Sequence, residues 1–216
     1  MVGSPRTFVI SAPSGTGKTT LNRRLVSEHP HVEKTITYTT RAIRVGEING
    51  DHYHFVDSEA FHKKIETGTL LEYAEVFGNL YGTGISEIKR IHDKNHIAIM
   101  EIDVQGWKQA KHKISDADSI FIIPPSIAEL VKRLKLRGTD DAAARTRRLR
   151  TAREELASAH LYNHFIVNDI LEEAYTQLEG IVIHSSHSRL STENGVAYCE
   201  RLLAEFDAFP WDPHGV

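Results

Sequence analysis

The segment Ala12-Pro13-Ser14-Gly15-Thr16-Gly17-Lys18-Thr19 restricts the possible folds of this chain more than any other. An apolar run, Phe8–Ala12, leads into it, and a helical pattern over Lys18–Glu28 follows it. The spacing is that of the phosphate-binding P-loop, with Ala12 at the position of the first glycine. The chain is therefore expected to pass here from a buried strand into a helix, with backbone N–H groups that converge on phosphate oxygens.

The residue types of this loop suit a nucleoside triphosphate. Gly15 and Gly17 can adopt the dihedral angles that a tight backbone cradle requires. Lys18 would reach the β- and γ-phosphates, and the Thr19 hydroxyl would hold Mg²⁺. The alternative interpretation is a glycine-rich turn with a surface lysine, and the strand before the loop and the helix after it argue against that. By itself the motif does not separate kinases from GTPases or motor proteins.

Further apolar runs predict an α/β fold with a parallel sheet flanked by helices. The runs lie at Ile97–Met100, Ser119–Ile123 and Phe165–Val167, and helical patterns follow them at Gly106–Lys113, Ile127–Arg137 and Leu171–Ile183. A capping box, Ser126 to Glu129, marks the start of the second of these helices. Short apolar strands that alternate with helices are typical of a parallel sheet that is covered on both faces.

The stretch Thr35–Thr83 interrupts this alternation. It holds strand-like runs at Thr35–Tyr38, His52–Val56 and Leu70–Val76, a short helical pattern at Ser58–Thr67, and several glycines. This pattern predicts a small mixed α+β insert between the first helix and the second core strand. Later in the chain, Gly138–Asp141 precedes a long arginine-rich helix over Ala142–His160, and a last helix is expected over Gly195–Phe206.

Composition excludes several classes of protein. The 26 basic and 29 acidic residues give a net charge of −3, which argues against a protein that coats nucleic acid or an acidic membrane. No apolar run approaches the roughly 18 residues that a transmembrane helix needs, and the start of the chain lacks the apolar stretch of a signal peptide. The single cysteine, Cys199, suits a reducing compartment. We therefore expect a cytoplasmic protein.

The absence of a guanine-reading motif argues against a Ras-type GTPase. Ras-type GTPases read guanine with Asn-Lys-x-Asp, and this chain has no such string. Asp103 and Gly106 have the spacing of a GTPase switch, but a small insert precedes them instead of a switch loop. Nucleotide-hydrolysing ATPases and small-molecule kinases remain.

Several further segments resemble the guanylate kinases, in that family's order and spacing. They are Thr37–Tyr53, Leu71–Glu75, Gly78–Thr83, Asp103–Gly106 and Ile166–Asp169. The resemblance runs from Arg6 to Ile183. It implies a P-loop kinase domain over 6–186, with a core of 6–34 and 84–186, a GMP-binding insert over 35–83 and a helical lid at about 137–148. Residues 187–216 would form a C-terminal helix and tail.

The resemblance also implies the reaction, in which ATP with Mg²⁺ phosphorylates GMP, and dGMP as well, to the diphosphate. Arg41, Arg44, Tyr53 and Tyr81 would bind the 5′-phosphate of GMP. Glu72 would accept hydrogen bonds from guanine N1–H and the N2 amine, and the Thr37 and Thr83 hydroxyls would meet O6. Adenine has an acceptor at N1 and no N2 amine, so it would leave a buried carboxylate without a partner.

The remaining roles follow from the same resemblance. Asp103 would serve the GMP and metal side of the cleft, and Glu101, at a usual aspartate position, would support that side without being a ligand. Residues 12–19 with Thr20 and Asn168 would bind ATP. Arg137 and Arg148 match the lid arginines and would join Lys18 and Asp103 in catalysis. The neighbouring arginines, Arg145, Arg147, Arg150 and Arg153, are expected on a solvated helix face.

Such a reaction needs no general base, because the acceptor is already an anionic phosphate oxygen, and positioning and charge stabilisation carry the transfer. Two other functions are consistent with the resemblance. One is a non-catalytic interaction domain of this family. Such domains tend to lose the P-loop lysine and the acceptor-site residues, whereas this chain has Lys18, Arg41, Arg44, Glu72 and Asp103. The other is a kinase for a different phosphorylated acceptor. The sequence leaves open whether the protein is a monomer or a homo-oligomer, and where the tail 207–216 lies.

Overall fold

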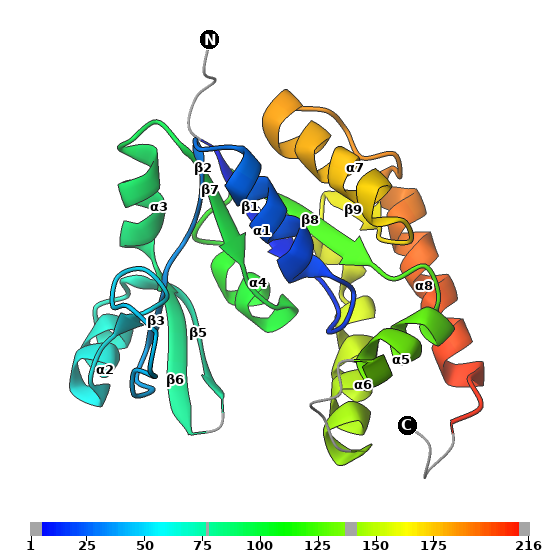
Figure 1. The fold of residues 1–216 in the computed structure, drawn as a ribbon, viewed down its shortest axis with the longest axis horizontal. Coiled ribbons are helices and arrows are strands. Elements are labelled where there is room, and N and C mark those ends of the chain that lie inside the picture. Colours follow the sequence, from blue (N-terminus) through cyan, green and yellow to red (C-terminus); the bar gives the residue numbers. More distant parts are fainter. Residues whose placement is uncertain (1–5, 77, 137–141, 212–216) are drawn as a thin grey trace. The chain divides into compact units, whose positions relative to one another are not determined.

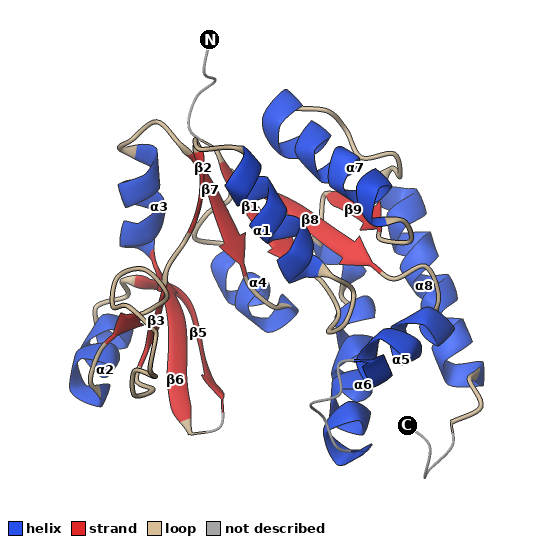
Figure 2. Ribbon diagram, viewed as in Figure 1, coloured by secondary structure: helices blue, strands red, loops and turns tan. Residues whose placement is uncertain are grey.

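The computed structural model describes residues 6–76, 78–136 and 142–211, and it has the predicted α/β fold. A five-stranded parallel sheet has the order β2-β7-β1-β8-β9, and a four-stranded mixed sheet has the order β4-β3-β6-β5 (Figure 2). The strands of the larger sheet are β1 (Thr7–Ser11), β2 (Val32–Lys34), β7 (Ile97–Glu101), β8 (Asp118–Ile123) and β9 (His164–Val167). The chain forms two compact units, 29–117 with the N-terminal segment to Val9, and 10–28 with 118 onward.

The first unit contains the insert and the edge of the larger sheet. The smaller sheet consists of β3 (Thr37–Thr39), β4 (His54–Phe55), β5 (Leu70–Val76) and β6 (Asn79–Gly84), and the helices are α2 (Ser58–Glu66), α3 (Ile85–His92) and α4 (Val104–Ala110). Strand β3 pairs parallel with β4 and antiparallel with β6, which also pairs antiparallel with β5. The expected mixed sheet is therefore confirmed. Buried Phe61, Leu70 and Leu71 form its core.

The first unit contains three elements that the sequence does not predict: β2, β6 and α3. Strand β6 is not predicted because Gly82 and Gly84 interrupt the alternation of apolar and polar residues that indicates a strand. Both glycines are needed: a Cβ at Gly82 would lie 2.8 Å from the Glu72 carbonyl oxygen, and one at Gly84 would lie 2.9 Å from the Tyr38 ring. Helix α3 is short and has Gly84 as its N-cap, without a capping side chain.

The second unit matches the predicted order of elements. Its helices are α1 (Lys18–Glu28), α5 (Ile127–Leu136), α6 (Ala142–Leu156), α7 (Leu171–His184) and α8 (Thr192–Ala208), with a 3₁₀ turn at Ala159–Leu161 (Figure 1). Ser126 Oγ accepts from the Glu129 N–H (3.1 Å), so the predicted cap of α5 is present. Among the described residues, no helix combines the length and the apolar character that a membrane crossing requires.

Helix α8 secures two other helices of the second unit. Glu205 Oε1 accepts from the Ile127 N–H at the start of α5 (2.8 Å), and Asp207 pairs with both nitrogens of Arg153 on α6 (2.8 and 3.0 Å). The tail turns back after α8, since the Trp211 indole donates to the Phe206 carbonyl oxygen (3.0 Å). Up to residue 211 the tail therefore packs against its own helix.

Candidate active site

The P-loop has the backbone geometry that its sequence predicts. It spans the residues between the end of β1 and the start of α1, and Gly15 and Gly17 have φ values of +94° and +97°. Thr16 is fully buried, and both its N–H (3.1 Å) and its hydroxyl (2.7 Å) donate to the Pro13 carbonyl oxygen. Lys18 opens α1, and Thr19 is exposed in its first turn. The loop is therefore a closed turn at a helix N-terminus, which suits an anion.

Asn168 stabilises the P-loop through a hydrogen bond to its backbone. It follows β9, is 4% exposed, and donates from Nδ2 to the Thr16 carbonyl oxygen at 2.6 Å. A Cβ at Gly17 would lie 2.5 Å from the same Nδ2 atom, and the φ of +97° disfavours any side chain at this position. The resemblance assigns Asn168 to ATP binding, and in the structure its amide fixes the backbone of the loop.

The structure describes one of the two predicted lid arginines, Arg148. Arg148 lies on α6, and its Nη1 donates to the Ser14 hydroxyl at 3.2 Å. One of the two predicted lid arginines is therefore at the phosphate loop. Arg137 lies outside the described residues. On the same helix, Arg147 and Arg150 are exposed, as expected, whereas Arg145 is partly buried.

Asn168→Ala should raise the KM for ATP about tenfold. The substitution leaves the buried Thr16 carbonyl oxygen without its donor, at a cost of about 1–3 kcal/mol, and about 1.4 kcal/mol is one factor of ten. Steady-state kinetics with varied ATP would measure the change.

Asn163→Ala is the matched control for this prediction. Asn163 stands at the other end of β9, where its Oδ1 accepts from the N–H and hydroxyl of Ser119 (3.2 and 2.8 Å). This control should lose similar stability with an unchanged KM for ATP. An equal rise in both variants would show that Asn168 acts only on stability.

The first unit brings together the residues predicted to read the base. Thr37 is paired with Thr83, and Thr83 with Glu72, so the three side chains lie in one row across β3, β6 and β5. Glu72 is 8% exposed and Thr83 1%. Both the hydroxyl and the backbone N–H of Thr83 donate to the Glu72 carboxylate. This row offers a carboxylate and two hydroxyls on one surface of the insert.

The surroundings of Glu72 shift the pKa of its carboxyl upward. Burial raises its pKa, and the nearby Asp103 carboxylate raises it further, while the Thr83 hydrogen bonds and Lys113 oppose this. Gly106 makes room for it: a Cβ there would lie 3.2 Å from Glu72 Oε2. Asp103 caps α4 by accepting from the Gly106 N–H at 2.7 Å. A ligand that donates two hydrogen bonds would compensate Glu72 for its loss of water.

The residues predicted to bind a phosphate gather around Arg41. Its guanidinium carbon lies 5.4 Å from the Tyr53 ring centroid, and Tyr81 shares a hydrogen bond with the same side chain. The two tyrosine rings are 6.1 Å apart. Sequence reasoning missed Glu47, whose Oε1 lies 2.6 Å from Arg41 Nη2 and whose Oε2 accepts from the Arg44 N–H at 2.8 Å. Glu47 sits three and six residues from the arginines, a spacing that could have revealed it.

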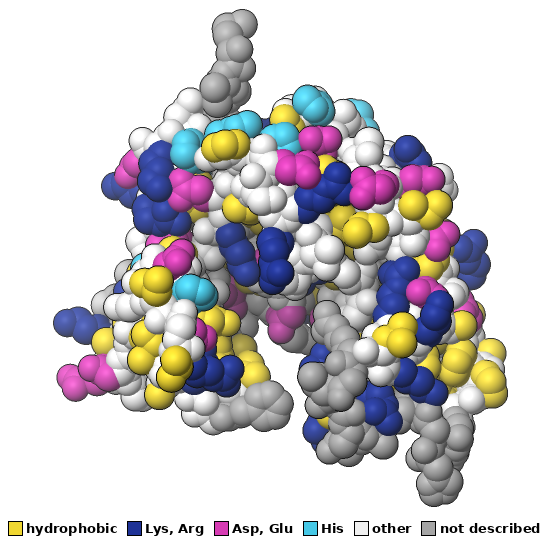
Figure 3. Space-filling model, in the orientation of Figure 1, with side chains coloured by type: hydrophobic (Ala, Val, Ile, Leu, Met, Phe, Trp, Pro, Cys, Tyr) yellow, Lys and Arg dark blue, Asp and Glu magenta, His cyan; other side chains and the backbone are white. Residues whose placement is uncertain are grey.

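The other predicted residues are more loosely connected to these groups. Arg44 is exposed. Glu101 ends β7 and forms an ion pair with Lys34 (2.9 Å) at the end of the adjacent strand β2. Its carboxylate therefore has a structural partner of its own, in line with a supporting role. The loop that contains Arg41 and Arg44 also carries exposed aliphatic side chains, those of Ile43, Val45 and Ile48. Figure 3 shows hydrophobic side chains on the surface of the insert.

The chain is similar to known proteins over most of its length. A family profile described as guanylate kinase matches residues 4–185. The guanylate kinase of Neisseria gonorrhoeae is 46% identical over 197 residues, which cover 91% of this chain and 94% of that one, and the guanylate kinase of Oleidesulfovibrio alaskensis is 44% identical over 181 residues, covering 84% and 88%. The crystal structure of guanylate kinase from Anaplasma phagocytophilum superposes with a TM-score of 0.64 at 31% identity, over 94% of this chain and 96% of that one.

Proposed function

The chain belongs to the guanylate kinase family, it is a GMP-phosphorylating kinase, and we propose that the residues described above carry out the transfer from ATP to GMP. The observation that carries the proposal is the buried Glu72 carboxylate in one row with Thr83 and Thr37. In this proposal the insert over 35–83 binds the acceptor, and the P-loop binds the donor.

Glu72 is proposed to select guanine. Its two oxygens accept from the N1–H and the N2 amine, and the Thr37 and Thr83 hydroxyls meet O6, for which the Thr83 hydroxyl gives up its hydrogen bond to Glu72. Adenine supplies neither donor, so its binding would leave the buried carboxylate with no hydrogen bond from the base. A site of this kind can discriminate by a factor on the order of 10⁴, whereas shape alone gives about 10²-fold.

Arg41 is proposed to bind the 5′-phosphate, together with Arg44 and the hydroxyls of Tyr53 and Tyr81. The substrate phosphate takes the place that the Glu47 carboxylate holds on the Arg41 guanidinium. A guanidinium fork matches phosphate and carboxylate oxygens equally well, so the exchange keeps the geometry of the arginine.

Lys18, Arg148 and the P-loop amides are proposed to stabilise the transferring phosphoryl group. Charge develops on its equatorial oxygens, and the lysine and the arginine neutralise it. Arg137 would add to this from the lid, and Asp103 from the GMP side. The Thr19 hydroxyl is an exposed hard oxygen ligand in the first turn of α1, which suits Mg²⁺. When bound, Mg²⁺ would neutralise charge on the β- and γ-phosphates.

A panel of acceptors tests this function. ADP release is measured with GMP, dGMP, AMP, UMP and CMP as acceptors. It should be detectable with GMP and dGMP, and kcat/KM with AMP should be lower by a factor on the order of 10⁴. Equal rates with AMP would refute the role of Glu72, and ADP release with only a non-guanine acceptor would favour the related kinase. A complete absence of ADP release would identify a non-catalytic interaction domain.

The domain boundaries and the location in the cell are part of the same proposal. The kinase domain is taken as 6–186, and the profile match over 4–185 supports it. Cys199 is buried, and burial raises the pKa of its thiol to about 12. Such a thiol is unreactive, which is compatible with the cytoplasm.

A further inference from the structure

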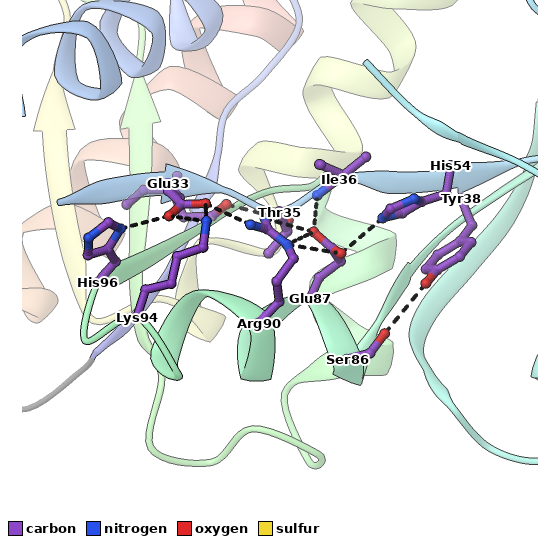
Figure 4. Close-up of polar contacts among 11 residues, drawn as sticks. Glu33, Thr35, Ile36, Tyr38, His54, Ser86, Glu87, Arg90, Lys94 and His96 are labelled. Carbon is purple, nitrogen blue, oxygen red and sulfur yellow. Dashed lines mark hydrogen bonds and ion pairs between the residues drawn. The ribbon is translucent and has the colours of Figure 1, made fainter. Parts of the chain in front are cut away.

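Glu87 has no part in the reaction described above. Among the described carboxylates of the first unit that form ion pairs, its side chain is the most buried. It lies in the first turn of α3, just after β6 returns the chain from the insert, and its side chain is 4% exposed. Figure 4 shows that groups from different segments converge on it. A buried charge of this kind persists only when it is fully paired.

Two of these groups belong to the insert and its entry. Glu87 Oε2 accepts from the backbone N–H of Ile36 at 2.9 Å, and Oε1 lies 2.9 Å from Nε2 of His54. Ile36 lies between β2 and β3, where the chain enters the insert, and His54 belongs to β4. One carboxylate at the exit of the insert is therefore bonded to its entry and to one of its strands.

His54 transmits this contact to the strand that leads to the substrate residues. Its ring stacks on Tyr38 with centroids 4.5 Å apart. Tyr38 is the central residue of β3, beside Thr37, and its hydroxyl lies 3.5 Å from the Ser86 hydroxyl. The position of β3 thus depends on the groups around Glu87.

The other side of Glu87 is tied to the β2–β7 pair. Arg90 donates from Nη2 to Glu87 Oε2 (3.0 Å) and from Nη1 to Glu33 Oε2 (2.7 Å), and Glu33 lies on β2. Burial raises the pKa of the Glu87 carboxyl, but the hydrogen bonds from Arg90, Ile36 and His54 outweigh it and hold the pKa below its usual range. The carboxylate is therefore ionised at neutral pH.

We propose that Glu87 is a positioning residue for the acceptor substrate, which fixes the insert to α3 through Ile36 and His54. The inference rests on the proposed function, because the insert carries Thr37, Arg41 and Glu72. Without Glu87 the substrate would have to order the insert when it binds, and that cost appears in the affinity for the acceptor. The P-loop and the chemical step need no contribution from this carboxylate.

The test compares Glu87→Gln with Glu33→Gln. Both variants lose a carboxylate that pairs with Arg90, but the other ion pairs of Glu33 are with Lys94 and His96 (3.0 and 2.7 Å), which lie outside the insert. For Glu87→Gln we expect a rise of about tenfold in the KM for GMP, with kcat and the KM for ATP within twofold of wild type. For Glu33→Gln all three parameters should stay within twofold.

His54→Gln provides a second variant that keeps the Glu87–Arg90 pair and so decides the matter if Glu87→Gln does not fold. It should raise the KM for GMP by a similar factor, and the double variant should be no worse than either single one. An unchanged KM for GMP in both variants, or an equal rise in Glu33→Gln, would overturn the positioning role.

Hydrogen exchange separates a failure of this inference from a failure of the proposed function. Amides of residues 36–56 should exchange faster in Glu87→Gln than in Glu33→Gln, whatever the protein phosphorylates. A wild-type protein inactive on GMP contradicts the proposed function. Equal exchange in the two variants contradicts the inference alone.

Discussion

Lys18→Met should lower kcat by about 10³-fold while the protein remains folded. The lysine places a positive charge where the transferring phosphoryl group develops negative charge, and removal of one such preorganised group typically costs about 10²–10³ in kcat. Methionine keeps the length and the helix propensity of the side chain at the start of α1, so the loop can retain its turn. ADP release at saturating ATP and GMP measures the loss, and circular dichroism verifies the fold.

Lys132→Met is a suitable control for this variant. Lys132 lies on α5 in the same unit, with a side chain 67% exposed beside Glu129. The Lys132→Met substitution removes one exposed lysine charge that is not part of the P-loop, so kcat should stay unchanged. Turnover of Lys18→Met close to that of wild type would remove the assignment of the P-loop as the phosphate site.

Glu72→Gln should lower kcat/KM for GMP by a factor on the order of 10³–10⁴ and reduce the preference for GMP over AMP. The amide has one acceptor and one donor group, so its NH₂ would face a donor of guanine and could not pair with it. Glu75→Gln, an exposed position of the same strand, should keep both values. Rates with GMP and AMP measure the ratio, and an unchanged preference would show that Glu72 does not read the base.

The same variant should be more stable than wild type at neutral pH. Because the pKa of Glu72 is raised in the folded protein, its stability contribution is complete below the unfolded pKa and is lost as the pH rises through the folded pKa. Glutamine does not titrate, so the gain in unfolding free energy should grow between pH 5 and pH 8. Urea unfolding at the two pH values measures it. A gain that is the same at both values would contradict the burial of an ionised carboxylate.

Much of the fold and part of the site could be predicted because their causes are local. The turn from β1 into α1 follows from Gly15, Gly17 and the helical pattern after them. Strand β6 could not be predicted, since Gly82 serves a close approach to the backbone of β5 that only the folded sheet contains. A segment with glycines forms a strand only if a partner strand pairs with it, and the sequence pattern does not identify that partner.

The site shows the same division. The acceptor residues could be named from their order along the chain, and the register of β3, β6 and β5 places three of them in one row. The supporting contacts could not be named, because they join distant segments: Asn168 and Thr16 are 152 residues apart, and Glu87 and His54 are 33 apart. A polar side chain between two unrelated segments leaves no periodic pattern. The roles of the site residues stay predictions.

The pair between Arg41 and Glu47 has a consequence for how the acceptor binds. The arginine is not a bare cation that waits for its substrate, because one Glu47 oxygen lies 2.6 Å from its Nη2 and the Ala42 carbonyl oxygen accepts from its Nη1 at 2.7 Å. Much of the loss of rotational freedom and of hydration that an arginine undergoes on capturing an anion has therefore taken place during folding. Binding of the nucleotide becomes an exchange of counterions, in which the displaced glutamate returns to water and pairs with the arginine again once the product leaves.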